Sequence, residues 1–223
     1  MNETDLIQLE KFMPKKPGIY GRHKLFNYAV MITLIEIDGE YNFVFEKRAK
    51  GIRQEGEICF PGGGYDPEND SSCANAAIRE TSEELGVPIE NIKVFGRMHT
   101  IVGAMGFVIE PFAGILHNIS PKDINIQKSE VEEVFFIPVS WFLKNKPETY
   151  SVMLQIKPSY EKKGEKKVLL PSEELGLPEK YKKPWGNIKQ RVLLYRFNDE
   201  VIWGLTAEMV SEFTRLLKNS KKP

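Results

Sequence analysis

A helix that carries three glutamates near its end directly follows a proline-glycine segment, and these two features constrain the fold more than any other part of the chain. We predict a helix over Ser71–Leu85, because Ser71 or Ser72 can cap its start and Gly86 ends it. The segment before it, residues 61–64, is one proline and three glycines. It is predicted to form a turn with unusual backbone geometry or a close approach to another group.

The three glutamates of this helix form an unfavourable pattern unless something neutralises them. Glu80, Glu83 and Glu84 can share one helix face, where like charges repel, and the helix dipole also disfavours anions near the C-terminal end. A bound Mg²⁺ or Mn²⁺ ion would relieve both effects, since hard cations prefer carboxylate oxygens and Mg²⁺ often binds substrate phosphates as well. Arg79 can pair with one carboxylate and orient it. The alternative is a solvated acidic face, and the neighbouring glycines favour the metal site.

The composition bounds the class of protein and its partners. Lysine and arginine number 31, as do aspartate and glutamate, so a formal charge of zero argues against nucleic acid or an anionic membrane as partner. The two cysteines cannot build a disulfide framework, so we expect a cytoplasmic protein. No apolar stretch is long enough to span a bilayer. A homodimer is left open.

The order of the predicted elements indicates an α/β sandwich with a mixed sheet. Residues 1–24 are predicted as an N-terminal helix and loop, and residues 25–223 as a single domain. A hairpin is expected at Asp38-Gly39, and the segments Tyr150–Ile156 and 168–170 are expected to flank a charged turn. Thr206 is expected to cap a last, amphipathic helix. The remaining predicted strands are 25–37, 41–46, 58–60, 92–98, 107–116, 134–139, 191–197 and 201–203.

Together, the glycine segment and the stretch Arg79–Val87 resemble the Nudix hydrolase signature. The spacer from Gly64 to Arg79 is one residue longer than the general pattern, and this insertion resembles the coenzyme A pyrophosphatase branch of the family. Three further segments resemble the same branch: residues 48–63, the acidic stretch 130–133 before an apolar run, and Ile-Trp-Gly-Leu-Thr-Ala at 202–207. The resemblance covers roughly residues 25–218.

The resemblance implies a Nudix-type α/β/α sandwich with a mixed sheet and a C-terminal helix. It implies a metal-dependent pyrophosphohydrolase, acting on a nucleotide substrate, in which Mg²⁺ or Mn²⁺ binds the diphosphate and water attacks one phosphorus. The general base is either Glu84 or a carboxylate of the 130–133 stretch, with Glu130 the first choice. The implied site residues are Arg79, Glu84 and Glu130 for catalysis, Glu80, Glu83 and Glu84 for the metal, and Arg48, Arg53, Gly63 and Gly64 for the substrate.

Coenzyme A or its thioesters are the first substrate expected, with 4′-phosphopantetheine and adenosine 3′,5′-bisphosphate as products. A second interpretation keeps the chemistry but changes the substrate to ADP-ribose or a dinucleotide. A third is a nucleotide-binding regulator without catalysis, which the intact glutamate cluster disfavours.

Overall fold

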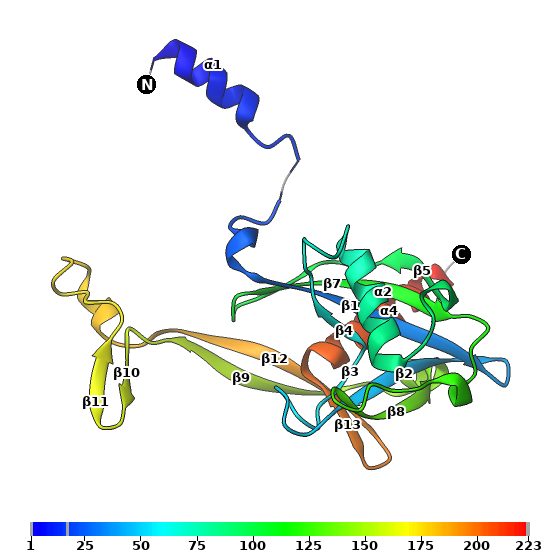
Figure 1. The fold of residues 1–223 in the computed structure, drawn as a ribbon. Helices are drawn as coiled ribbons and strands as arrows, with labels where there is room; N and C mark the ends of the chain where they lie inside the picture. Colours follow the sequence, from blue (N-terminus) through cyan, green and yellow to red (C-terminus); the bar gives the residue numbers. More distant parts are fainter. Residues whose placement is uncertain (1, 17, 222–223) are drawn as a thin grey trace. The chain divides into compact units, whose positions relative to one another are not determined.

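The computed structural model describes residues 2–16 and 18–221, and its elements are drawn in Figure 1. By packing, the described residues divide into two compact units. Unit 1 takes those within Met1–Gly39 and Phe60–Lys128, and unit 2 takes those within Glu40–Cys59 and Ser129–Pro223. The α-helices are α1 (Glu3–Phe12), α2 (Cys73–Leu85), α3 (Val139–Lys144) and α4 (Gly204–Ser220). The strands are β1 (Phe26–Ile37), β2 (Glu40–Arg48), β3 (Ile58–Cys59), β4 (Gly62–Gly64), β5 (Ile92–Arg97), β6 (Ile101–Gly103), β7 (Phe107–Leu116), β8 (Val131–Pro138), β9 (Glu148–Ile156), β10 (Ser159–Lys162), β11 (Glu165–Val168), β12 (Trp185–Phe197) and β13 (Glu200–Trp203).

Unit 1 is a mixed sheet with α2 packed on it. β1 runs parallel to β7 and antiparallel to β4, and β7 is antiparallel to β5 and β6. Residues 31–35 of β1 are all buried, as is usual for a strand in the interior of a sheet. α2 contacts β1, β4, β5 and β7. The sheet therefore fixes the helix that carries the predicted site.

The two ends of α2 are set by local sequence. The Ser72 side chain accepts a hydrogen bond from the Asn75 backbone N–H at 3.2 Å, which confirms a serine cap. Gly86 ends the helix in the left-handed region at φ 62°. A Cβ at Gly86 would lie 2.0 Å from the carbonyl oxygen of Asn125, so glycine is required there for packing as well as for conformation.

Unit 2 contains a second set of antiparallel strands and the last two helices. β2 pairs with β3 and β8, and Phe43 of β2 makes edge-to-face contacts with Phe142 of α3 and Phe213 of α4. β12 pairs with both β13 and β9, and the β9–β12 ribbon leads to a small β10–β11 hairpin at its far end (Figure 1). α4 packs on β12, β13 and α3. The α/β class, the mixed sheet and the C-terminal helix are confirmed.

Three local predictions are wrong. Tyr150–Ile156 pairs with β12 rather than with residues 168–170, because the charged segment between them forms its own hairpin of β10 and β11. Thr206 does not cap α4, which begins at Gly204, and its hydroxyl instead donates to the Ile58 carbonyl at 3.2 Å. Gly62–Gly64 form β4 rather than a turn. Glycine allows this, since a Cβ at Gly62 would lie 2.5 Å from the Ala29 carbonyl oxygen.

Of the remaining predictions about the order of elements, the turn after β1 is confirmed and the domain boundary stays a prediction. The turn between β1 and β2 has positive φ at both Asp38 and Gly39, as the sequence predicts. The extension at residues 1–24 followed by one domain stays a prediction, although α1 buries none of its side chains. Within residues 2–16 and 18–221, no helix combines the length and apolar character needed to cross a membrane.

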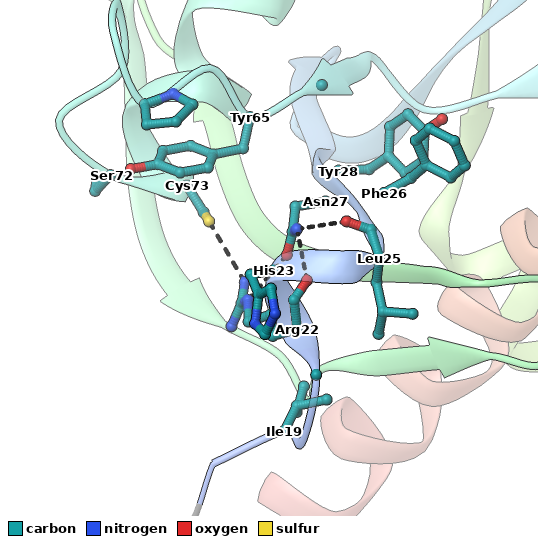
Figure 2. Close-up of a pocket in the computed structure, with 13 residues that line it drawn as sticks. Ile19, Arg22, His23, Leu25, Phe26, Asn27, Tyr28, Tyr65, Ser72 and Cys73 are labelled. Carbon is teal, nitrogen blue, oxygen red and sulfur yellow. Dashed lines mark hydrogen bonds between the residues drawn. The ribbon is translucent and has the colours of Figure 1, made fainter.

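Unit 1 leaves a cavity of about 1090 Å³ beside the start of α2. Figure 2 shows Tyr65 and Cys73 on one part of its wall and Phe26 and Tyr28 on another. Gly64 also lines it, and no acidic side chain does. Burial raises the pKa of the Cys73 thiol, so this group lines the cavity as a neutral thiol.

A buried ion cluster that the sequence analysis missed lies beside this cavity. Glu110 of β7 is 2% exposed and binds Arg22 at 2.8 Å, Thr100 at 2.9 Å and Arg97. Burial alone would raise the pKa of Glu110, but the hydrogen bonds from Thr100, Arg97 and Arg22 outweigh it and hold the pKa below its ordinary value. The available signal was a glutamate inside an otherwise apolar strand.

We expect Glu110→Gln to destabilise unit 1 by about 2 kcal/mol at neutral pH, less than for a fully buried pair because both arginines stay partly exposed. A carboxylate with a depressed pKa stabilises the fold above its unfolded pKa and loses that effect as pH falls through the folded pKa. The difference between wild type and variant should therefore shrink below about pH 4. Urea unfolding at neutral and acidic pH measures this, and an equal difference at both would contradict it.

Candidate functional site

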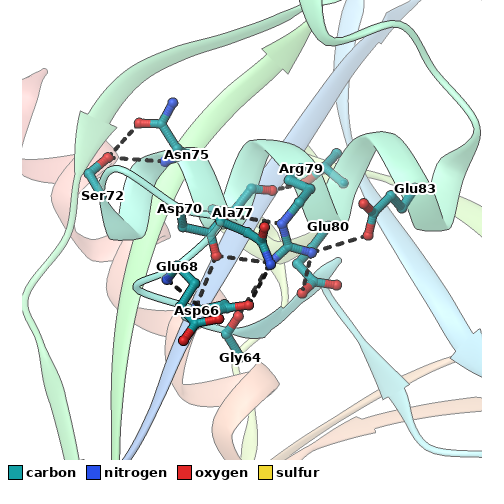
Figure 3. A network of polar contacts seen from close by, with 12 residues as sticks. Gly64, Asp66, Glu68, Asp70, Ser72, Asn75, Ala77, Arg79, Glu80 and Glu83 are labelled. Carbon is teal, nitrogen blue, oxygen red and sulfur yellow. Dashed lines mark hydrogen bonds and ion pairs between the residues drawn. The ribbon is translucent and has the colours of Figure 1, made fainter. Parts of the chain in front are cut away.

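Arg79 is the centre of a polar network on α2, shown in Figure 3. Its guanidinium donates to both carboxylate oxygens of Asp70 at 3.0 Å, and a further N–H reaches the Gly64 carbonyl at 3.4 Å. The hydrogen bonds from Arg79 lower the pKa of the buried Asp70 carboxyl, and Asp70 in turn raises the pKa of Arg79. Asp70 thus fixes the guanidinium in one orientation.

The fixed guanidinium orients two of the predicted metal-binding carboxylates. Nη1 of Arg79 donates to Glu80 at 2.9 Å and to Glu83 at 3.1 Å (Figure 3). Glu80 is 15% exposed and Glu83 is 52% exposed. Arg79 therefore orients carboxylates as predicted, and it holds two of them rather than one.

Glu80 lies directly against the backbone of β4. A Cβ at Gly63 would be 2.3 Å from the Glu80 carboxylate, so only glycine leaves room for this position of Glu80. Gly63 pairs with Ala29 of β1, which fixes its backbone in the sheet. The close approach predicted for the glycine segment is confirmed here, and the group approached is a predicted metal ligand.

Glu84 is held separately from the other two glutamates. It is 2% exposed, and its Oε2 accepts the Gly62 backbone N–H at 2.9 Å. A buried carboxylate bonded to a backbone N–H has little rotational freedom. The structure thus ties all three glutamates to one region, Glu80 and Glu84 through neighbouring glycines and Glu83 through Arg79.

These residues fit a divalent cation by the chemistry of their donors and by the cradle at Gly63. Carboxylate oxygens are the ligands that Mg²⁺ and Mn²⁺ prefer, and Gly63 leaves the space around Glu80 free of a side chain. In the part of the chain that the structure describes, no three His, Cys, Asp or Glu side chains already converge as a metal cluster. Arg79 and the Gly62 N–H donate hydrogen bonds to carboxylate oxygens that would also bind a cation.

The other predicted site residues belong to unit 2. Nε of Arg48 donates to the Arg53 carbonyl at 3.0 Å, and the Glu130 carbonyl accepts the Ala49 N–H at 2.8 Å. These bonds bring the two arginines together and connect the turn that follows β2 with the start of β8. Glu132 and Glu133 lie within β8 and are exposed. The roles of Arg48, Arg53 and Glu130 stay predictions.

The comparisons with known proteins identify the family of the chain. The family model for the NUDIX domain matches residues 25–156. Nudix hydrolase 3 of Caenorhabditis elegans is 31% identical, with 52% of this chain and 49% of that protein covered. Peroxisomal coenzyme A diphosphatase NUDT7 of Mus musculus is 32% identical, covering 66% and 62%. Mitochondrial coenzyme A diphosphatase NUDT8 of Homo sapiens is 27% identical, covering 55% and 52%.

The chain therefore belongs to the NUDIX domain family. The similarity to coenzyme A diphosphatases expected from the sequence is confirmed, since two of these relatives carry that name. The chain spans about half of the nematode and human proteins and 62% of the mouse protein.

Proposed function

We propose that the protein is a metal-dependent Nudix pyrophosphohydrolase that cleaves the diphosphate of coenzyme A or its thioesters. The observation that carries this proposal is the placement of Glu80 against Gly63, with Glu84 on the neighbouring Gly62 N–H. Carboxylates held beside a glycine backbone suit a cation and a phosphate, because no side chain blocks their approach. The names of the mouse and human relatives support coenzyme A as the substrate.

In this reaction, the oxygen of water bonds to one phosphorus and the bridging P–O bond breaks, giving 4′-phosphopantetheine and adenosine 3′,5′-bisphosphate. Bound at Glu80, Glu83 and Glu84, Mg²⁺ or Mn²⁺ would supply positive charge for the phosphate oxygens. The chain itself orients these carboxylates through Arg79 and Asp70. Glu84 or Glu130 would accept the proton of the attacking water.

The cavity of unit 1 supports coenzyme A as the proposed substrate by its size. It adjoins the glutamate site, since Gly64 lines it and the Gly64 carbonyl accepts a hydrogen bond from Arg79. Its volume of about 1090 Å³ is at the upper end of ligand pockets and can take one half of a dinucleotide-sized molecule. Its lining includes Tyr28, Tyr65 and Phe26, which provide surfaces for a flat ring or an apolar chain. Arg48 and Arg53 are proposed to bind substrate phosphate, as arginines commonly do.

The cysteines and the net charge of the chain support a proposed location and a proposed partner. Cys59 and Cys73 are not joined in a disulfide, which supports a reducing compartment such as the cytoplasm. A small nucleotide derivative is the proposed partner of this site, in agreement with the zero formal charge of the chain.

The substrate assignment is tested by incubating the purified protein with coenzyme A, 3′-dephospho-coenzyme A and ADP-ribose, and by separating products by liquid chromatography with mass detection. We expect coenzyme A to be cleaved with Mg²⁺ or Mn²⁺ and no cleavage with EDTA. Much faster cleavage of the other two substrates would show that the substrate is a different nucleoside diphosphate derivative and not coenzyme A. Metal-independent turnover would contradict the proposed site, and binding without cleavage would indicate a regulator.

A further inference from the structure

The β9–β12 ribbon of unit 2 has one apolar face and one polar face. Directly opposite residues of an antiparallel pair share a face. Tyr150 lies opposite Val192, and Leu154 lies opposite Ile188. Val152 and Ile156 alternate with them along β9 and so point to the same side. We call these six side chains the ribbon face: Tyr150, Val152, Leu154, Ile156, Ile188 and Val192.

The other side of the ribbon is polar. There Ser151 lies opposite Arg191, Met153 lies opposite Lys189, and the Gln155 amide donates to Asn187 at 2.9 Å. This alternation is the pattern of a sheet whose one side packs on another layer.

Within the described part of unit 2, no such layer covers the ribbon face. Four of its side chains remain half-exposed or more: Tyr150 at 51%, Val152 at 50%, Ile156 at 53% and Ile188 at 60%. Along this stretch the ribbon has two strands, since β13 pairs only with Leu194–Phe197 of β12 and β9 is the last strand of its sheet. Two strands alone are marginally stable in water, and exposed apolar patches of this kind mark interaction surfaces.

We propose that the ribbon face is a self-association surface, covered by the ribbon face of a second copy of this chain. None of its six side chains carries a charge, and neither do Trp185, Gln190 and Leu194 on the same side. Glu148, opposite Leu194 at the start of β9, is the charged residue of this side, and Arg196 neutralises it at 2.8 Å. Two identical copies can therefore meet there without bringing like charges together. Two-fold contacts of this type are self-complementary by symmetry.

The charge distribution also favours a second copy. Residues 157–189 carry nine lysines and five glutamates, a net charge of +4. Because the whole chain sums to zero, the remaining residues carry −4. The basic end of the ribbon on one copy is thus attracted to the rest of the other copy, and this attraction decreases with added salt.

The area of the ribbon face bounds the expected strength of self-association. A ribbon of nine residues is roughly 30 Å long and offers on the order of 300 Å² on one face, whereas a stable interface buries about 800 Å² per partner. The exposed Val168, Leu169 and Leu175 at the end of the ribbon can add to it. The ribbon face alone is therefore smaller than a stable interface, and we expect weak association that depends on protein concentration.

The test is sedimentation velocity of the full chain over low to high micromolar concentrations, with wild type and three variants. Wild type should shift toward twice the monomer mass as concentration rises. Val152→Asp and Val152→Lys should each stay monomeric, since a two-fold contact brings the new charges together. An equal mixture of these two variants should associate again. Met153→Asp is the matched control, because Met153 is 62% exposed on the opposite face beside Lys189, and it should dimerise as wild type does.

Circular dichroism and the unfolding midpoint establish that each variant is folded. Wild type that is monomeric at every concentration, dimeric Val152 variants, or dissociation by Met153→Asp would each overturn the proposal. A monomer that instead co-sediments with phosphatidylserine vesicles through Val152 would also overturn it and place a membrane on this face.

Discussion

Glu84→Gln is expected to lower kcat for the diphosphate substrate on the order of 10³-fold while the fold remains intact. Glutamine has the same shape as glutamate. Its side-chain oxygen can still accept the hydrogen bond that the Gly62 N–H donates to Glu84 at 2.9 Å. It lacks the negative charge needed to bind a cation or to accept a proton. Steady-state kinetics at saturating Mg²⁺ measure the change, with circular dichroism to verify the fold.

The matched control for Glu84→Gln is Glu90→Gln, an exposed glutamate in the short turn after α2. It removes the same charge a short distance along the chain and should leave kcat within about twofold, as expected for a surface substitution away from any special contact. Full activity of Glu84→Gln, together with loss in Glu130→Gln, would assign the base to Glu130. Full activity in both would remove these carboxylates from catalysis.

The parts of the fold that depend on neighbouring residues could be predicted from sequence. Ser72 and Gly86 bound α2 through contacts within a few residues, and Asp38-Gly39 forms its turn by its own backbone preferences. The pairing of β9 with β12 could not be predicted, because both strands are apolar enough to pair with other segments. The intervening 28 residues include a hairpin of their own, β10 with β11, and nothing local indicates which strands meet across this segment.

The contact of Arg79 with glutamates of α2 was predictable from sequence, and the electrostatics around it were less so. The sequence argument held that repulsion between Glu80 and Glu83 calls for a divalent cation. The structure shows that Nη1 of Arg79 already lies between them, at 2.9 and 3.1 Å, so repulsion alone does not require a metal. A contact that fixes Glu80 directly comes from Gly63, whose missing side chain leaves room for its carboxylate. That contact joins a strand to a helix 17 residues later, and spacing alone could not reveal it.

Gly63→Ala is expected to reduce kcat/KM by about 10²-fold with little loss of stability. The added Cβ would lie 2.3 Å from the Glu80 carboxylate, which must move away. Glu80 is the end of a flexible side chain, so it can swing aside at small cost to folding, but it then loses its place beside the glycine backbone. Gly96→Ala in β5 is the matched control, because its Cβ would meet nothing within 4 Å and Gly96 does not line the cavity. Kinetics and thermal unfolding of both variants separate activity from stability. Equal activity in the two variants would show that the position of Glu80 against Gly63 has no part in the reaction.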